Sequence, residues 1–118
     1  MTFEEFRTLM NEFRAAVDRE GEDEKDSYLA LEALHTFCEK LEGSEKEFAD
    51  RVLTEWLLSD DEGLRFDAEA LIDDYCVIQA LPALATLRER LAMDNSPGAP
   101  FEIEKLERIS RNLQGLGD

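Results

Sequence analysis

The chain has 118 residues, which suits one domain, and 43% of them are hydrophobic, enough to form a buried core. Its 29 Asp and Glu residues outnumber its 13 Lys and Arg residues, so the formal net charge is −16. That charge argues against binding to nucleic acid or to an anionic membrane, because both attract Lys and Arg. The sequence contains no apolar run of transmembrane length, no basic secretion signal and only two cysteines, which favours a reduced, cytoplasmic protein.

Hydrophobic residues recur at three- and four-residue steps along most of the chain, which predicts an all-α fold of about six helices in antiparallel hairpins. The segment from Thr2 to Glu5 forms a capping box and predicts a first helix that ends near Asp18. The acidic stretch 18–26 is expected to be a solvated connection. The inward positions expected on the first helix are Phe3, Phe6, Leu9 with Met10, Phe13 and Val17.

The next two helices are predicted over about 26–42 and from Ser44 onward. Gly43 lies between them, where many helices end in a left-handed residue. A second capping box from Ser44 to Glu47 opens the third helix. The apolar face of that helix is expected to carry Phe48, Val52, Leu53, Trp56 and Leu57.

Three further helices follow the acidic turn 59–61, which is expected to supply the N-cap of the fourth. Pro82 is placed in the first turn of a fifth helix, because proline breaks no helical hydrogen bond there. Residues 95–99 are expected to form a loop, and Pro100 to start a sixth helix that Gly115 and Gly117 end. Short loops between helices leave little room for a sheet, so we expect one α-helical domain over 1–118.

Residues 59–84 contain a pattern that suggests a repeat, and they read SDDEGLRFDAEALIDDYCVIQALPAL. The matching positions are Asp60, Leu64, Arg65, Ala68, Leu71, Ile72, Ala80, Leu81, Pro82 and Leu84. This segment resembles the HEAT-like helical repeat of the phycobilisome-lyase type, although bulky Leu71-Ile72 stands where Ala-Leu is usual and Asp73 where Gly is usual. The resemblance implies a short HEAT-like α-α stack, with helices two and three as one unit and helices four and five as another. A compact helical bundle is the alternative.

Chemical motifs are scarce, with no phosphate-binding glycine loop, nucleophile elbow or HExxH sequence. The single histidine, His35, follows Glu32 with the Glu-x-x-His spacing of di-iron bundles, but such sites need a second copy of this motif. Cys38 and Cys76 are expected at or near buried helical faces in a structural role, and a disulfide between them stays open. We therefore expect no catalytic residue, no metal and no cofactor.

The strongest functional signal is the acidic segment from Asp60 to Asp74, which holds seven acids against Arg65 alone. It lacks the alternating oxygen ligands and central glycine of a calcium loop. It is either a solvated face that keeps the protein soluble or a docking surface for a basic protein. Part of this set, residues 67, 69, 73 and 74, is expected to lie partly on the outer face of the fourth helix. The candidate partner-binding residues are Asp60, Asp61, Glu62, Asp67, Glu69, Asp73 and Asp74.

Four large apolar side chains also bear on function. Trp56 lies on an apolar stripe and is expected in the core, whereas Leu58, Phe66 and Phe101 fall off the main stripes of their helices. Each of these three is either an exposed contact residue or part of a wider buried face.

Two functions follow from these features. The first is a non-enzymatic, acidic protein-binding module, resembling in character an immunity protein or inhibitor that neutralises a basic, nuclease-like toxin. The alternative is a HEAT-like scaffold or adaptor that binds a peptide or a subunit of a protein complex. The sequence leaves the oligomeric state open.

Overall fold

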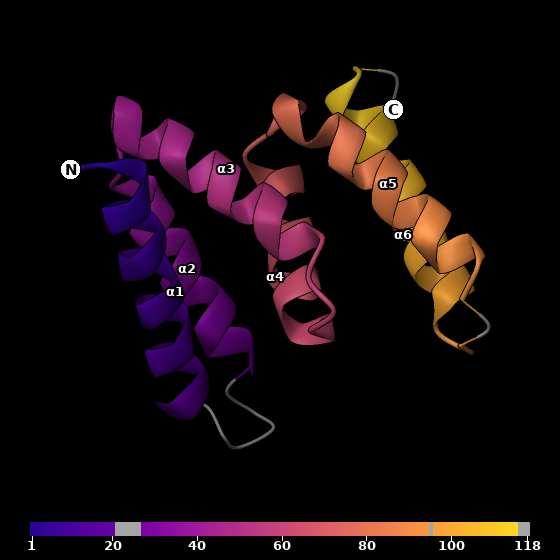
Figure 1. Cartoon of the computed structure of the whole chain (residues 1–118), viewed down its shortest axis with the longest axis horizontal. Coiled ribbons are helices and arrows are strands. Elements are labelled where there is room, and N and C mark those ends of the chain that lie inside the picture. The colour runs from indigo at the N-terminus through magenta and orange to yellow at the C-terminus, as the bar shows by residue number, and fades with distance from the viewer. Residues whose placement is uncertain (21–26, 95, 116–118) are drawn as a thin grey trace. The chain divides into compact units, whose positions relative to one another are not determined.

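The computed structural model describes residues 1–20, 27–94 and 96–115, and these residues form six α-helices, one short 3₁₀ helix and no strand (Figure 1). The all-α prediction is therefore confirmed. Among the described residues, no helix has the length and apolar composition that a bilayer crossing requires. The helices are α1 (Phe3–Glu20), α2 (Ser27–Glu39), α3 (Ser44–Leu57), α4 (Glu62–Asp74), η2 (Ile78–Ala80), α5 (Leu81–Ala92) and α6 (Ala99–Leu113).

The chain divides into two compact units, Met1–Val52 and Leu53–Asp118, and the division falls inside α3. In the first unit, α1 and α2 lie side by side and run antiparallel (Figure 1). In the second, α6 contacts both α5 and α4, and α5 and α6 form an antiparallel pair. The helical-repeat resemblance and the single-domain assignment stay predictions.

The interior of the first unit is rich in aromatic rings. The Phe6 side chain is 1% exposed, and its ring centroid lies 6.1 Å from that of Phe37 and 5.9 Å from that of Phe48. Met10 is fully buried, whereas Leu9 is 44% exposed. The inward position of this turn is therefore Met10, and the expectation that Leu9 also faces inward is wrong. Adjacent residues of a helix point about 100° apart, and at this turn the buried face of α1 includes Met10 but not Leu9.

The interior of the second unit is mostly aliphatic. Trp56 is buried, which confirms its predicted place in the core. Ala68 is also fully buried, and a small residue at such a position lets helices approach closely. Besides these, the buried apolar side chains of this unit include Leu53, Leu57, Leu71, Ile72, Leu84, Leu87, Leu106 and Ile109.

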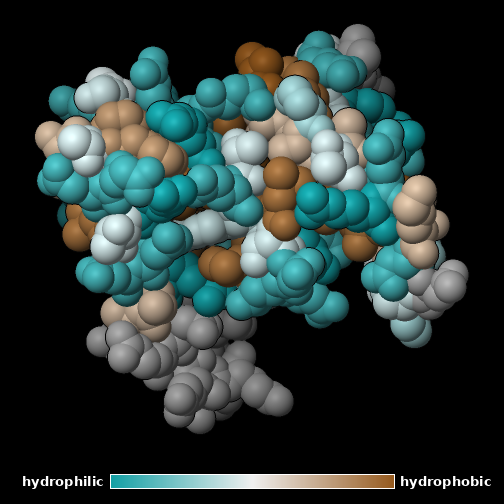
Figure 2. Space-filling view, in the orientation of Figure 1, coloured by the Kyte–Doolittle hydropathy of each residue, from teal (hydrophilic) through white to brown (hydrophobic). Residues whose placement is uncertain are grey.

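The surface is mostly polar, as expected from the charge. On the face drawn in Figure 2, hydrophilic residues predominate and hydrophobic ones are scattered among them. The large hydrophobic side chains that are exposed among the described residues are Met1, Leu9, Phe66, Ile78, Met93 and Phe101. Leu58 is half-buried.

Local capping signals place several helix ends as predicted. The Thr2 hydroxyl accepts a hydrogen bond from the Glu5 amide and donates one to the Glu5 carboxylate, both at 3.2 Å. Asp61 is the N-cap of α4, and its Oδ1 accepts from the Gly63 amide at 2.8 Å. Pro82 lies in the first turn of α5. Gly43 has a φ of +61°, the left-handed conformation expected at that position.

The two cysteines occupy different environments, and both are free thiols. Cys38 is half-buried, and burial, aided by the charge of Asp50, raises the pKa of its thiol to about 11. Cys76 is exposed with a φ of +52°, so its expected place near a buried helical face is wrong. It follows the last turn of α4, where the Val77 amide donates to the Ile72 carbonyl at 3.0 Å and reverses the chain.

Candidate functional site

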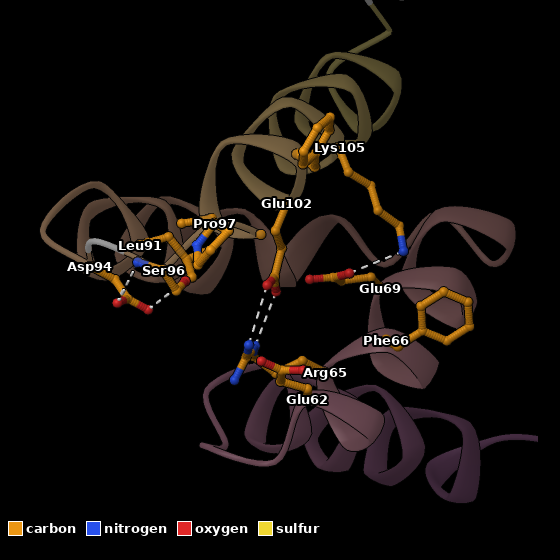
Figure 3. A pocket seen from close by; sticks show the side chains of 13 residues that line it. Glu62, Arg65, Phe66, Glu69, Leu91, Asp94, Ser96, Pro97, Glu102 and Lys105 are labelled. Carbon is orange, nitrogen blue, oxygen red and sulfur yellow. Dashed lines mark hydrogen bonds and ion pairs between the residues drawn. The ribbon is translucent and has the colours of Figure 1, made fainter.

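A cleft of about 550 Å³ lies in the second unit, between α4, α6 and the residues that follow α5 (Figure 3). We call it the α4–α6 cleft. Four carboxylates and two cations line it, so its wall is negatively charged on balance. Its lining residues are Glu62, Arg65, Phe66, Glu69, Leu91, Asp94, Ser96, Pro97, Gly98, Ala99, Phe101, Glu102 and Lys105.

Helical spacing brings the polar side chains of this cleft together. Residues three, four and seven positions apart share one helix face, which aligns Glu62, Arg65 and Glu69 on α4. The same rule aligns Glu102 and Lys105 on α6. Because α6 packs against α4, these two rows face each other, as Figure 3 shows for the labelled side chains.

The first cross-helix link is a two-pronged ion pair between Arg65 and Glu102. Arg65 Nε and Nη2 donate to the two carboxylate oxygens of Glu102 at 3.0 and 3.2 Å, and Nη1 donates to the Ser59 carbonyl at 3.2 Å. The hydrogen bond with Glu102 raises the pKa of Arg65, which burial opposes. Burial by itself would raise the pKa of Glu102, but the hydrogen bonds from Arg65 and Glu69 outweigh it and lower that pKa.

The second link joins Lys105 to Glu69. Lys105 Nζ lies 3.1 Å from Glu69 Oε1 and 4.3 Å from the centroid of the Phe66 ring. The Glu69 side chain is only 3% exposed, and its Oε2 has no hydrogen-bond partner among the described residues. An ionised oxygen buried in this way is costly, because nothing replaces its lost hydration.

A proton on Glu69 explains how this oxygen is accommodated. Burial raises the pKa of Glu69 to about 7, the hydrogen bond with Glu102 adds to the shift, and Lys105 opposes it. In Figure 3 the carboxyl group of Glu69 points toward that of Glu102, which itself points toward Arg65. With a pKa of about 7, Glu69 is protonated in part of the molecules at neutral pH, and in those molecules its proton is available to the Glu102 carboxylate, so that the two groups share one negative charge.

The structure places the seven predicted partner-binding residues in different environments. Asp60, Asp61 and Glu62 are exposed at the start of α4, where the Asp61 side chain is engaged as the N-cap. At the other end of α4, Asp74 is exposed and Asp73 is half-buried. The acids at the start of α4 and those at its end lie about 20 Å apart along the helix axis, because a helix rises about 1.5 Å per residue. Glu62 and Glu69 are the members of the set that line the α4–α6 cleft.

Two members of the set are buried. Asp67 is 7% and Glu69 is 2% exposed, so the expectation that they lie on the outer face of α4 is wrong. Periodicity locates the main apolar stripe of a helix, but it does not reveal which polar face a later helix covers. In the case of Glu69, that later helix is α6, which supplies Lys105.

Sequence reasoning missed the α6 half of the site. Arg65 and Glu102 are 37 residues apart, and no local pattern pairs them. The three-residue spacing of Glu102 and Lys105 is the one local signal of a shared face. For Phe66 and Phe101 both alternatives were open, and the structure exposes them by 55% and 77%.

In the ranges 1–20, 27–94 and 96–115, no three or more His, Cys, Asp or Glu side chains are placed to hold a metal ion. The absence of cofactors and of catalytic activity stays a prediction.

Comparisons with protein-family models, with curated proteins and with solved structures find no match. What the α4–α6 cleft can bind is therefore inferred from its own side chains. Carboxylate oxygens beside aromatic rings suit a cationic group, because the face of a ring attracts positive charge. Lys105 makes both kinds of contact at once, with Glu69 and with Phe66.

Proposed function

We propose that the chain is a non-enzymatic protein-binding module whose partner is a basic protein, and that it acts as an immunity-type inhibitor of a nuclease-like toxin. One observation carries the proposal: the chain has a formal net charge of −16, and most of the acids whose burial is described are exposed. Of the acids whose burial is described, only Asp67 and Glu69 are buried. A surface charge of this size accelerates encounter with an oppositely charged protein and disfavours acidic competitors.

A nuclease is a suitable target on chemical grounds. Its substrate site presents Lys and Arg side chains to phosphate groups, and carboxylates can take the positions of those phosphates. Exposed acids at the mouth of the α4–α6 cleft, Glu62 and Asp94, supply such groups. Phe66 and Phe101 supply exposed apolar area beside them, which interface centres commonly use.

An adaptor function is the second candidate, and the exposed apolar side chains favour it. Phe66, Ile78, Met93 and Phe101 are all more than half exposed in the second unit. An interface centred on such residues requires no opposite charge on the partner. The two functions therefore predict different responses of binding to salt.

The test begins with a partner captured from the source cell by the tagged full chain, identified and purified. Its affinity is then measured by calorimetry at about 50 mM and about 300 mM NaCl. We expect a partner rich in Lys and Arg whose dissociation constant rises about tenfold or more over this range. A neutral partner whose affinity does not change with salt would overturn the proposal in favour of the adaptor. For a nuclease partner, the chain should inhibit nucleic-acid cleavage at equal molar amounts.

Two variants with equal net charge locate the binding surface. Asp60→Asn with Glu62→Gln removes two exposed acids next to the cleft, and Glu12→Gln with Glu42→Gln removes two exposed acids from the first unit. We expect the first pair to weaken partner binding about fivefold and the second pair less than about twofold. Equal effects would show that only the total charge matters.

A further inference from the structure

We propose that the α4–α6 cleft binds a guanidinium group, an arginine side chain of the basic partner, through the carboxyl groups of Glu69 and Glu102. The inference rests on the proposed function and names the chemical group that the site selects. Glu69 belongs to the acidic set that the sequence singled out, but the structure places it inside the cleft.

The acceptor is the unpartnered oxygen of Glu69. Its side chain is 97% buried, as the 3% exposed fraction implies, and Oε2 contacts no hydrogen-bond donor among the described residues. Figure 3 shows this carboxyl group directed across the cleft toward Glu102. Once Glu69 has lost its proton, Oε2 is a buried acceptor without a donor, which is costly, and a ligand that brings N–H groups removes that cost.

The charge balance of the cleft favours a cation. Its wall carries Glu62, Glu69, Asp94 and Glu102 against two cations, so two negative charges are uncompensated when all groups are ionised. A cation that enters the site restores this balance. Entry to Oε2 requires a side chain to move, and Lys105, which is 27% exposed, has the long flexible stem for it.

Guanidinium suits the site better than ammonium does. Its planar fork of N–H donors matches carboxylate geometry, and its flat face stacks on aromatic rings. Glu102 already accepts such a fork from Arg65, at 3.0 and 3.2 Å, and each of its oxygens keeps a second lone pair that a further N–H group can use. The exposed rings of Phe66 and Phe101 line the same cleft and offer stacking surfaces.

Binding of the cation is expected to release a proton. When Glu69 is protonated it donates to Glu102, and a guanidinium group replaces that proton as the donor. The charged groups that face Glu69 are Arg65 on its own helix and Glu102 and Lys105 on α6, with Glu62 and Asp94 at the mouth of the cleft. Since the pKa of Glu69 is about 7, affinity for the guanidinium group should rise between pH 6 and pH 8.

The test uses two blocked peptides of equal charge, one of six arginines and one of six lysines, titrated into the full chain and followed by NMR. At about pH 7.5 and 50 mM NaCl, wild type should bind the arginine peptide about threefold more tightly than the lysine peptide. The largest amide shifts should fall on residues 62–69 and 101–105. Glu69→Gln should weaken arginine-peptide binding about fivefold and remove the preference for arginine.

Glu104→Gln is the matched control, because Glu104 is exposed on α6 and lies outside the cleft lining. It removes the same charge and should change both affinities less than about twofold. If Glu69→Gln and Glu104→Gln behave alike while both peptides still bind, the cleft is not the arginine site and the proposed function stands. If neither peptide binds wild type at low salt, the proposed function itself fails.

Discussion

In the first unit, Met1–Val52, aromatic rings form much of the interior, whereas the second unit, Leu53–Asp118, buries aliphatic side chains and covers a charged cluster beside them. Both of the buried acids found among the described residues, Asp67 and Glu69, belong to the second unit. Burying a charged side chain lowers the stability of the fold unless hydrogen bonds or ion pairs replace its lost hydration. A buried charged cluster of this kind therefore points to a function. The comparison therefore locates the candidate site in the second unit.

The largest expected effect concerns the aromatic interior of the first unit. Phe6→Ala removes a fully buried ring that contacts Phe37 and Phe48, and we expect the free energy of unfolding to fall by about 3–5 kcal/mol. Leu9→Ala, at an exposed position of the same helix, should cost less than about 1 kcal/mol. Urea denaturation measures both. Equal losses for the two variants would contradict the assignment of the core.

The next largest effect is expected when a substitution removes the ion pair between Arg65 on α4 and Glu102 on α6 in the second unit. Arg65→Met leaves the half-buried Glu102 carboxylate without its forked donor and should cost about 2–3 kcal/mol at pH 7. The control is Arg88→Met, because Arg88 and Glu107 form an exposed pair at 3.7 Å whose loss should cost less than about 0.5 kcal/mol.

The cost of Arg65→Met should also depend on pH. The pKa of Glu102 is lower in the folded protein than its ordinary value of 4.5, so the ion pair stabilises the fold fully above that value. The contribution disappears as the pH falls through the folded pKa and Glu102 becomes neutral. A cost that stays constant down to acid pH would contradict the role of this pair.

The contribution of Glu69 to the free energy of unfolding is expected to depend on pH in the opposite direction from that of Glu102. Its pKa rises from 4.5 to about 7 on folding, so between these values the folded chain binds more protons than the unfolded chain. Stability is therefore lost as the pH rises through this window. Glu69→Gln keeps a neutral side chain that can still donate to Glu102, and it should be more stable than wild type by about 2 kcal/mol at pH 8 and by nearly nothing at pH 4.5.

Thermal unfolding followed across this pH range checks the Glu69 prediction. Glu104→Gln, an exposed change on α6, should give no comparable gain at high pH. A Glu69→Gln curve parallel to that of wild type would show that Glu69 is ionised in the folded protein throughout.

The smallest effect concerns the end of α4. Cys76 adopts a φ of +52°, which glycine tolerates without strain, so Cys76→Gly should stabilise the chain by about 0.5–1 kcal/mol. Cys76→Ala keeps the strain of a side chain and should give no gain. Chemical denaturation under reducing conditions compares the two variants, and a loss of stability in Cys76→Gly would contradict the explanation.

Much of the fold could be predicted because its determinants are local. The capping box from Thr2 to Glu5, the N-cap at Asp61 and the position of Pro82 each act within one helical turn. They place the observed helix ends within about three residues of the expected ones. The 21–26 part of the predicted connection lies outside the described residues, and α1 extends through residues 18–20 that were expected in it.

The site could be predicted only in part because its determinants are not local. The excess of acids in 60–74 is visible in the sequence, but the partner of the buried Glu69 is Lys105, which lies 36 positions later in the chain. The pairing of Arg65 with Glu102 likewise appears only when α6 has packed on α4. Side chains whose roles depend on a distant helix leave no periodic signal.

The central claim, that Glu69 in the α4–α6 cleft is where the basic partner places its positive charge, is tested most directly by one pair of titrations. The affinity of the purified partner is measured for wild type and for Glu69→Gln from about pH 6 to pH 8 at constant salt. Wild type should bind several-fold more tightly at the upper end, while the affinity of Glu69→Gln should hardly change with pH. Two curves of the same shape and height would contradict the claim.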